Sequence, residues 1–357
     1  MHDVSDTNLV ISDRPLCGVE LGFELVTRLG EVDGPGALIA SPYAVTVDSR
    51  GRYYVLASSS VREPVKVFNQ NGSFLTDLGR IGEGPGEYQM PAVVLISQGD
   101  TVNIFDMGNR RLTVLSPQYE IVRTLDLPRR INMAGAVLVN TDQFGTNFDL
   151  HGSDSTTSAV QIMDRSGSIV HAFSNERNRS GRGPPQFYRS MRSLSGSRDG
   201  LWSAPMFFEY RLEQWDTAGR RLRNFLRRPK WFQPHDTVRS RSPEYPPSPV
   251  VAAIREDQAG RLWSSVLVAD SQWAEGLGEP IAGEGGQTHY QTEDVEATLD
   301  TYLEIIAPSG RLLVSRRFDR LFAYLIADSL IGRAMSDDAG IPFVEVYRVT
   351  LTPEKSE

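Results

Sequence analysis

Residues 42–57, PYAVTVDSRGRYYVLA, and residues 64–79, PVKVFNQNGSFLTDLG, decide the fold of this 357-residue chain. Each stretch holds two runs of alternating apolar and polar side chains, separated by a turn with Gly and Asp, Ser or Asn. Alternation with a period of two indicates a strand, and a short Gly-containing turn between two such runs indicates a hairpin. Together the two stretches predict a unit of four antiparallel strands.

The same unit recurs along the chain. Its second half is repeated in RLTVLSPQYEIVRTLDL from Arg111, AVQIMDRSGSIVHAFS from Ala159, RLEQWDTAGRRLRNFLR from Arg211, YLEIIAPSGRLLVSRRFD from Tyr302 and FVEVYRVTLTPE from Phe343. Its first half is repeated in VLISQGDTVNIFD, VLVNTDQFGTNFD, LSGSRDGLWSAPM, AIREDQAGRLWSS and YLIADSLIGRAM. The chain therefore holds six copies, the last of which lacks one strand.

Four-stranded units of about 40–50 residues repeated around an axis predict a β-propeller. We expect an all-β fold in which six four-stranded antiparallel blades form one domain, residues 21–357, after a tail of residues 1–20. The run GFELVTRLG at residues 22–30 is expected to supply the missing strand of the last blade and to close the ring.

A resemblance to a known family supports this architecture. PYAVTVDSRGRYYVLA followed by VKVFNQNGSFLTDLG is similar to an NHL repeat, and FDMGNRRLTVLS resembles the core of that repeat. The similarity is close over residues 42–131, and after residue 131 only the general layout of the repeat is matched. The chain thus resembles the NHL-like six-bladed propellers of bacteria, a group that includes scaffolds, ligand-binding modules and a few enzymes. The resemblance implies the fold much more than the function.

Composition narrows the classes of partner. A formal net charge of −8 argues against a general nucleic-acid binder, which is normally basic. The single cysteine, Cys17, excludes a disulfide within the chain, and no apolar run approaches the roughly 18 residues of a membrane span. The polar start shows no signal peptide. We expect a monomer outside the cytoplasm, its leader removed, that binds a small molecule or a protein.

The glycine-rich stretch GRIGEGPGEYQMP at residues 79–91 is interpreted as a connector between blades. Its glycines do not follow the G-x-G-x-x-G or Walker spacing of phosphate-binding loops, and no helix pattern follows. Similar sequences occur at two other connections between blades, DGPGALIASP from Asp33 and GRGPPQFYRS from Gly181. Such loops share a face with the loops inside each blade, so Glu83, Glu87 and Tyr88 are candidate ligand-binding residues.

Acidic side chains recur in the loops between the second and third strands of the blades. Oxygen ligands converging on an axis are what Ca²⁺ requires. Asp106, Asp149, Asp270 and Asp337 are therefore candidate metal ligands, and Ca²⁺ is the one candidate cofactor. The competing interpretation is structural, because Asp and Asn favour turns and bond to nearby backbone groups. Two further candidates for ligand contact in these loops are Glu209 and Tyr210.

Catalytic residues are sparse in the sequence. The five histidines do not recur at equivalent blade positions, and no G-x-S-x-G nucleophile motif is present. His151 in FDLHGSD falls in a loop expected at the tunnel mouth, where it is the candidate general base, with Asp149 beside it. A surface histidine with no catalytic role is the competing interpretation.

Two insertions interrupt the repeat. Residues 229–249 are Pro-rich, and residues 270–300 separate the second and third strands of the fifth blade. Long loops in a compact domain are usually functional or disordered. The second insertion carries Trp273, a candidate ligand-binding residue, and is expected to be a lid, a partner-binding arm or a surface loop. The basic run RRLRNFLRRPK at residues 220–230 is interpreted as a solvated outer edge of a blade.

Two hypotheses about function follow. The first is a ligand- or protein-binding propeller without catalysis that uses its tunnel-mouth face. The second is a hydrolase of the six-bladed lactonase or phosphotriesterase type, with Ca²⁺ as its candidate cofactor, acting on an ester, lactone or phosphotriester at the same mouth.

Overall fold

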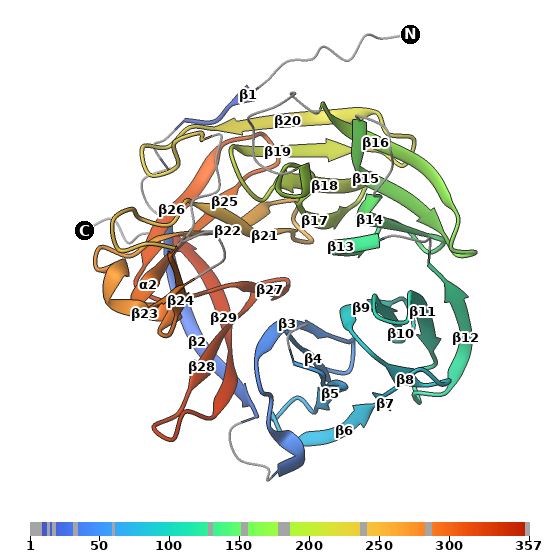
Figure 1. The fold of residues 1–357 in the computed structure, drawn as a ribbon. Helices are drawn as coiled ribbons and strands as arrows, with labels where there is room; N and C mark the ends of the chain where they lie inside the picture. The colour runs from blue at the N-terminus through green and yellow to red at the C-terminus, as the bar shows by residue number, and fades with distance from the viewer. Residues whose placement is uncertain are drawn as a thin grey trace, which may run out of the picture.

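The computed structural model describes residues 9–12, 15, 19–30, 35–58, 61–127, 131–150, 156–177, 186–235, 241–282 and 288–353. Six sheets, five of four antiparallel strands and one with a fifth strand added at its edge, surround a central axis, so the predicted all-β six-bladed propeller is confirmed (Figure 1). The innermost strands of successive blades contact each other all the way around the ring. No helix among the described residues is long and apolar enough to cross a membrane.

The first three blades follow the repeat directly. Blade one consists of β3 (Pro42–Val47), β4 (Tyr53–Ala57), β5 (Val65–Phe68) and β6 (Phe74–Leu78). Blade two consists of β9 (Pro91–Ser97), β10 (Thr101–Asp106), β11 (Arg111–Leu115) and β12 (Ile121–Asp126). Blade three consists of β13 (Ile131–Leu138), β14 (Gln143–Leu150), β15 (Thr156–Asp164) and β16 (Ile169–Arg177).

Blades four and five carry the additions to the repeat. Blade four consists of β17 (Arg192–Ser197), β18 (Gly200–Pro205), β19 (Tyr210–Trp215) and β20 (Arg221–Arg227), and the short helix α1 (Gln186–Ser190) precedes it. Blade five consists of β21 (Val250–Glu256), β22 (Leu262–Ala269), β25 (Leu299–Ile306) and β26 (Leu312–Phe318). Its insertion forms the hairpin of β23 (Leu277–Ala282) and β24 (Thr288–Thr292), between η2 (Trp273–Gly276) and α2 (Val295–Thr298).

The ring closes in blade six as the sequence predicts. This blade consists of β27 (Tyr324–Ala327), β28 (Leu330–Ser336), β29 (Pro342–Pro353) and, outermost, β2 (Val19–Leu29) from the start of the chain. β2 pairs antiparallel with β29 over its whole length, from Val19 opposite Pro353 to Leu29 opposite Val344. Leu21 and Leu29 of β2 are buried, so the closing strand contributes to the core.

A fifth strand on blade four corrects one expectation. β1 (Leu9–Val10), from within the predicted tail, pairs parallel with β20 at Phe225 and Leu226. The interpretation of residues 220–230 as a solvated outer edge is therefore wrong where β1 covers the edge. Arg227 at the end of β20 is buried and bonded to Glu304.

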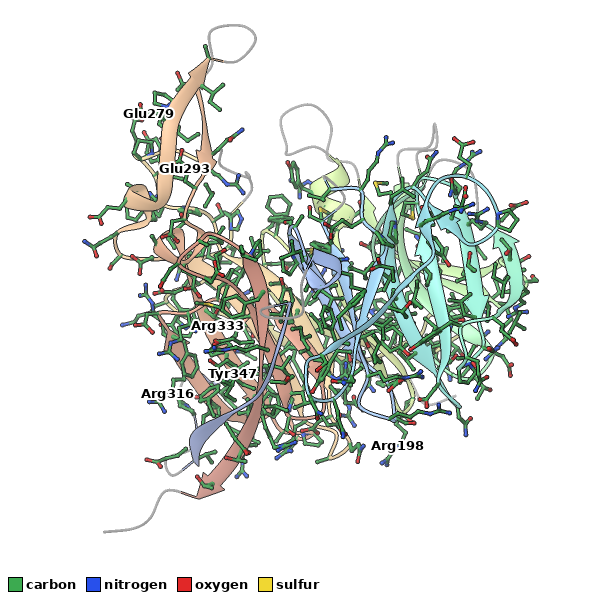
Figure 2. All side chains as sticks on the ribbon, turned by 90° about the horizontal axis from the view of Figure 1, so that it is seen from below. Arg198, Glu279, Glu293, Arg316, Arg333 and Tyr347 are labelled. Atoms are coloured by element: carbon green, nitrogen blue, oxygen red, sulfur yellow. The ribbon has the colours of Figure 1, made fainter. Side chains whose placement is uncertain are left out.

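The blades have two distinct ends because neighbouring strands are antiparallel. Turns joining the first to the second strand and the third to the fourth strand lie at one end, which we call the turn face. Loops joining the second to the third strand, and the crossings between blades, lie at the other end, which we call the insertion face. The β23–β24 hairpin with Glu279 and Glu293 projects from the insertion face, whereas Arg198 lies at the opposite end (Figure 2).

Candidate functional site

A channel of about 440 Å³ runs between the innermost strands of all six blades. Alternate residues of an inner strand face opposite sides of the blade, so few side chains of each strand reach the axis. The lining includes Tyr43 and Thr46 from β3, Arg192 and Ser193 from β17, and Arg255 from β21. The channel therefore combines apolar side chains with two guanidinium groups and a phenol.

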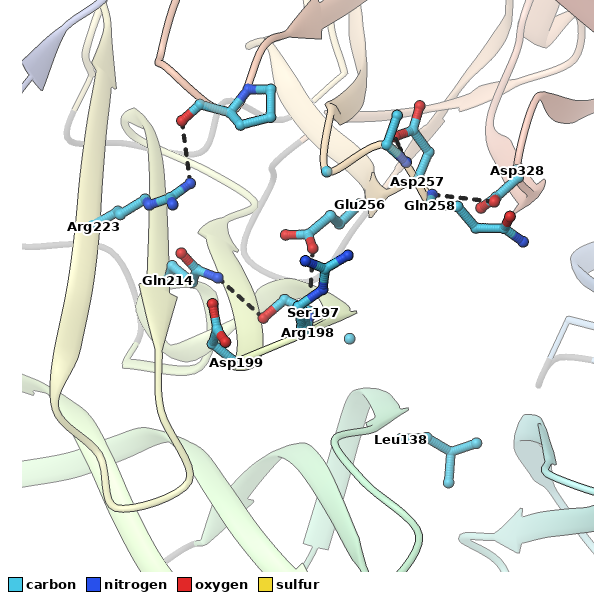
Figure 3. A pocket seen from close by; sticks show the side chains of 14 residues that line it. Leu138, Ser197, Arg198, Asp199, Gln214, Arg223, Glu256, Asp257, Gln258 and Asp328 are labelled. Atoms are coloured by element: carbon cyan, nitrogen blue, oxygen red, sulfur yellow. Dashed lines mark hydrogen bonds between the residues drawn. The ribbon is translucent and has the colours of Figure 1, made fainter.

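A second hollow of about 620 Å³ opens on the turn face, where the first turns of blades four and five meet (Figure 3). Its lining includes Arg198, Asp199 and Gln258, all from these turns. Leu138, Gly196 and Glu256 line both the hollow and the channel. The two spaces therefore adjoin each other, and we call the hollow the mouth of the channel. It lies at the opposite end from the insertion face, where the loops with His151 and the other candidates were expected to form a tunnel mouth.

The turn of blade five is held rigid by one carboxylate. Asp257 Oδ1 accepts hydrogen bonds from the backbone N–H groups of Ala259 and Arg261, at 3.0 and 2.9 Å. Its Oδ2 accepts from Arg261 Nε at 2.7 Å and from Trp263 Nε1 at 2.9 Å. Gly260 between them has a φ of 73°, which glycine adopts without strain. The residues before and after this turn are thus presented to the mouth in a fixed conformation.

Polar side chains inside the mouth also have definite partners. Glu256 accepts from Trp202 Nε1, and its carboxylate lies 3.4 Å from the backbone N of Arg198. Arg223 Nη1 donates to the carbonyl of Pro308 at 3.2 Å. Asp328 Oδ2 accepts from the backbone N–H of Gln258 at 3.1 Å. These contacts fix the shape of the mouth and leave its charged groups facing one open space.

The connector at residues 79–91 joins β6 to β9, as predicted, through the parallel bridge of β7 (Arg80–Ile81) and β8 (Glu87–Tyr88). Glu87 accepts from Gly84 N at 2.8 Å and pairs with Arg80 at 2.6 Å. The hydrogen bonds and the guanidinium lower the pKa of Glu87. Tyr88 is buried in the core, and the exposed Glu83 accepts from Gln89 Nε2.

The remaining candidate ligand contacts on the insertion face are distributed between surface and core. Glu209 forms an ion pair with Arg211 at 3.0 Å. Tyr210 is buried, and its hydroxyl donates to Glu304 at 2.9 Å. Trp273 lies in η2 at the root of the inserted hairpin and is partly buried. The structure thus does not bring these three side chains into one site, and their contact with a ligand stays a prediction.

The candidate metal ligands that the structure describes bond to backbone. Buried Asp106 accepts from the N–H groups of Gln89 and Met90, at 3.1 and 2.8 Å, and thereby ties the connector to blade two. Asp270 accepts from Gln272 N at 2.6 Å, in the first turn of the insertion. Asp337 caps the turn between β28 and β29 through two N–H groups. Each therefore has the structural role that the competing interpretation assigns to it.

No group of three or more His, Cys, Asp or Glu side chains that could hold a metal ion occurs within the described ranges. Asp106, Asp270 and Asp337 are thus not brought together. Asp149 lies in β14 opposite Asn132, but its side chain is outside the described set, as are residues 151–155 with His151. A calcium site and a catalytic role for Asp149 and His151 stay predictions.

The residues of the channel and mouth did not stand out in the sequence. Arg255 and Glu256 occupy the run AIRED, which has only the alternation expected of a strand. A usable signal was the repeat itself, since a charged residue in the first strand of a unit must lie near the axis.

Comparisons with known proteins agree with this architecture. Residues 36–181 match the model of the family DUF5128, described as a 6-bladed beta-propeller. No curated protein matched the chain in sequence. A Bacteroides fragilis protein provisionally named as exported superimposes with a TM-score of 0.60 at 11% identity, covering 96% of this chain and 100% of its own. A duf4221 family member from Bacteroides vulgatus gives 0.60 at 10% identity, covering 93% and 99%. These similarities show the fold that this chain shares with both.

Proposed function

We propose that this chain is a ligand-binding propeller that admits a small molecule from the turn face into its central channel. The observation that carries the proposal is that two hollows of about 620 and 440 Å³ adjoin and share three lining residues. Small-molecule sites in proteins typically occupy roughly 300–1,000 Å³ and combine apolar walls with a few fixed polar groups. The channel matches this description in volume and in its largely apolar walls, and the mouth matches it in volume.

Binding without catalysis is favoured by the side chains that line the two spaces. The described lining of channel and mouth contains no histidine, cysteine or lysine. Ser195, a hydroxyl in the channel, donates to the carbonyl of Gly196 and accepts from the backbone N–H of Glu256. A serine held by backbone groups lacks the adjacent base that activates a nucleophile. The hydrolase hypothesis depends on Asp149 and His151 and would need a site on the insertion face.

A channel-filling substitution tests the proposal. Thr46 of β3 lines the channel and is partly buried, so Thr46→Phe should fill the space without removing a core contact. Thr124 of β12 is exposed on an outermost strand, which makes Thr124→Phe the matched control. Binding of butyrate, butyramide, glucose, gluconate and putrescine to each protein would be measured by saturation-transfer NMR.

We expect at least one probe to bind the wild type and Thr124→Phe but not Thr46→Phe. If no probe binds, or if every bound probe binds Thr46→Phe equally well, the proposal is wrong. Ala253→Phe, on the innermost strand β21 of blade five, repeats the test if Thr46→Phe fails to fold.

A further inference from the structure

We propose that Arg255 is the anchor of the channel and that it binds the carboxylate of a small organic acid. This inference rests on the proposed function, because it names the class of ligand that the channel takes. Arg255 belongs to β21, the innermost strand of blade five, and lines the channel. Its guanidinium therefore borders the space into which a ligand would fit.

The guanidinium of Arg255 is only partly satisfied by the protein. Its Nε is buried and has no hydrogen-bond partner among the described residues. Within the described part of the chain its one hydrogen bond runs from Nη1 to the carbonyl of Leu325 at 3.5 Å, the outer limit for such a bond. Buried donors without partners are rare in folded proteins, because each loses its bonds to water without replacement. An orphaned Nε beside an open channel points to a partner that enters from outside the chain.

The nearest carboxylates do not fill this role. Asp328 attracts Arg255 through space, but forms no ion pair with it and is bonded to Gln258 N at 3.1 Å. Glu256 is the next residue of the same strand, so its side chain leaves on the opposite side, where it meets Trp202. Burial lowers the pKa of Arg255, yet a guanidinium stays protonated at neutral pH. A partly buried positive charge thus remains in the channel without an ion pair to any described residue.

The free edge of this guanidinium matches a carboxylate. Nε and the neighbouring Nη2 form the parallel pair of donors that binds two carboxylate oxygens at once. Arg192 adds a second positive charge to the channel while its Nη1 donates to the carbonyls of Arg189 and Met191. The phenol of Tyr43, an exposed side chain that lines the channel, is a further donor there.

The mouth carries more negative than positive side chains, in contrast to the channel. Its lining contains two arginines and four carboxylates, Arg198, Arg223, Asp199, Glu256, Asp257 and Asp328. A ligand that places its carboxylate at Arg255 therefore leaves its other end beside an acidic rim. Such a rim favours a neutral or cationic end over a second carboxylate, so we assign the site to monocarboxylates.

The test compares butyrate with butyramide, which has nearly the same shape without the charge. Both would be titrated into the wild type, Arg255→Gln, Arg255→Lys and Arg316→Gln. Arg316 is exposed on the outermost strand of the same blade, so Arg316→Gln makes the same change of charge outside the channel (Figure 2). Dissociation constants from NMR titration are the readout, and thermal melts report whether each variant folds.

We expect butyrate to bind the wild type about tenfold or more tightly than butyramide, since charge-assisted hydrogen bonds are about twice as strong as neutral ones. Arg255→Gln should abolish this preference, Arg255→Lys should keep part of it, and Arg316→Gln should leave it unchanged. Lysine retains the charge but cannot donate the parallel pair of hydrogen bonds. Arg255→Lys therefore still tests the anchor if Arg255→Gln does not fold.

Two outcomes overturn the assignment to Arg255. Equal binding of butyrate and butyramide, or full retention of butyrate by Arg255→Gln, refutes the anchor; the proposed function survives if Thr46→Phe still blocks binding. Binding that neither Thr46→Phe nor Arg255→Gln alters refutes both. Inorganic phosphate is a third probe. Displacement of butyrate by equimolar phosphate would assign the site to a ligand with a phosphate group and not to a carboxylate.

Discussion

One residue pattern shapes the hairpin turns of this propeller. An aspartate Oδ1 accepts the N–H groups two and four residues later, and a glycine with positive φ lies three residues later. This geometry stabilises the turn because it satisfies two backbone donors at once. It recurs at Asp48, Asp164, Asp216, Asp257 and Asp337.

The burial of each turn determines how much its aspartate stabilises the fold. Asp257 also bonds Trp263 and Arg261 and is buried, whereas Asp337 lies in an exposed turn. We expect Asp257→Ala to lower the free energy of unfolding by about 2–4 kcal/mol and Asp337→Ala by about 1 kcal/mol. Urea denaturation measures both. Equal losses would contradict a role for the two additional side-chain bonds.

The aspartate pattern also shows what sequence could and could not predict at this scale. The turns were predictable because Asp, Gly and the flanking alternation lie within a few residues of one another. The role of each carboxylate was not predictable, since the sequence contains the same aspartate at position 337 whether it caps a turn or binds a cation. Only the positions of Ala339 N and Ile341 N show that its Oδ1 accepts two backbone bonds.

Two elements of the fold depend on contacts that no local sequence pattern predicts. β1 consists of two residues, too few to carry an alternation, and it is located only by its pairing with β20. The insertion of blade five was expected as a loop, and it contains the β23–β24 hairpin. At its root, Asp270 N donates to the carbonyl of Thr298, and Asp300 follows at the start of β25. The root therefore brings two carboxyl groups together.

This pair of carboxyl groups predicts a pH-dependent stability. Burial raises the pKa of Asp300 and the neighbouring Asp270 adds to the rise, whereas Arg317 lowers it. The folded state thus holds the proton more tightly than the unfolded chain, and the stabilisation is full below about pH 4 and is lost as pH rises through the folded pKa. Asparagine stays neutral and can donate to Asp270, so Asp300→Asn should gain stability over the wild type between about pH 4 and pH 7.

Urea denaturation across that range measures the difference. Asp270→Asn is the companion variant, because it removes the negative charge that repels the carboxylate of Asp300. It should also reduce the loss of stability that the wild type shows as pH rises. Parallel stability curves for the wild type and both variants would show that the two carboxyl groups do not share a proton.

Blades four and five are joined by a buried ion pair. Arg227 of β20 and Glu304 of β25 lie 2.6 Å apart with 1% and 0% of their side chains exposed, and Tyr210 and Ser315 donate to the same carboxylate. Removing one partner leaves the other charge buried. We therefore expect Arg227→Met to lower the free energy of unfolding by about 3–5 kcal/mol.

The double variant Arg227→Met/Glu304→Gln distinguishes the causes. Its amide is neutral, so it should recover part of the loss if the isolated carboxylate is the cause. Arg316→Met, on an exposed position of β26, should change stability by less than about 0.5 kcal/mol. A double variant no more stable than Arg227→Met would assign the loss to packing.

The whole molecule is a ring whose centre is built from residues far apart in the chain. Local repeats predicted six blades and the closing strand, because each blade repeats one pattern. They did not predict the channel, which needs Tyr43, Arg192 and Arg255 at the same axis although more than two hundred residues separate the first from the last. The direction of each inner side chain depends on strand register, and a slip of one residue reverses it.

Closure by β2 makes a prediction about the intact ring. Deleting residues 1–30 exposes the edge of β29 and removes the packing of Phe23 against Phe318 and Phe322, so we expect loss of cooperative unfolding or a fall in Tm of many degrees. Deleting residues 1–18 leaves β2 in place and removes β1, the buried Ile11 and two carbonyls that accept from Arg227, so it should cost less. Because Val19 lies opposite Pro353, moving residues 19–30 behind residue 353 through a short turn makes an ordinary hairpin. This permuted chain should melt close to the 1–18 deletion, and calorimetry of the three proteins measures all of these effects. A 1–30 deletion as stable as the 1–18 deletion would show that five complete blades and a partial sixth hold the ring without its closing strand.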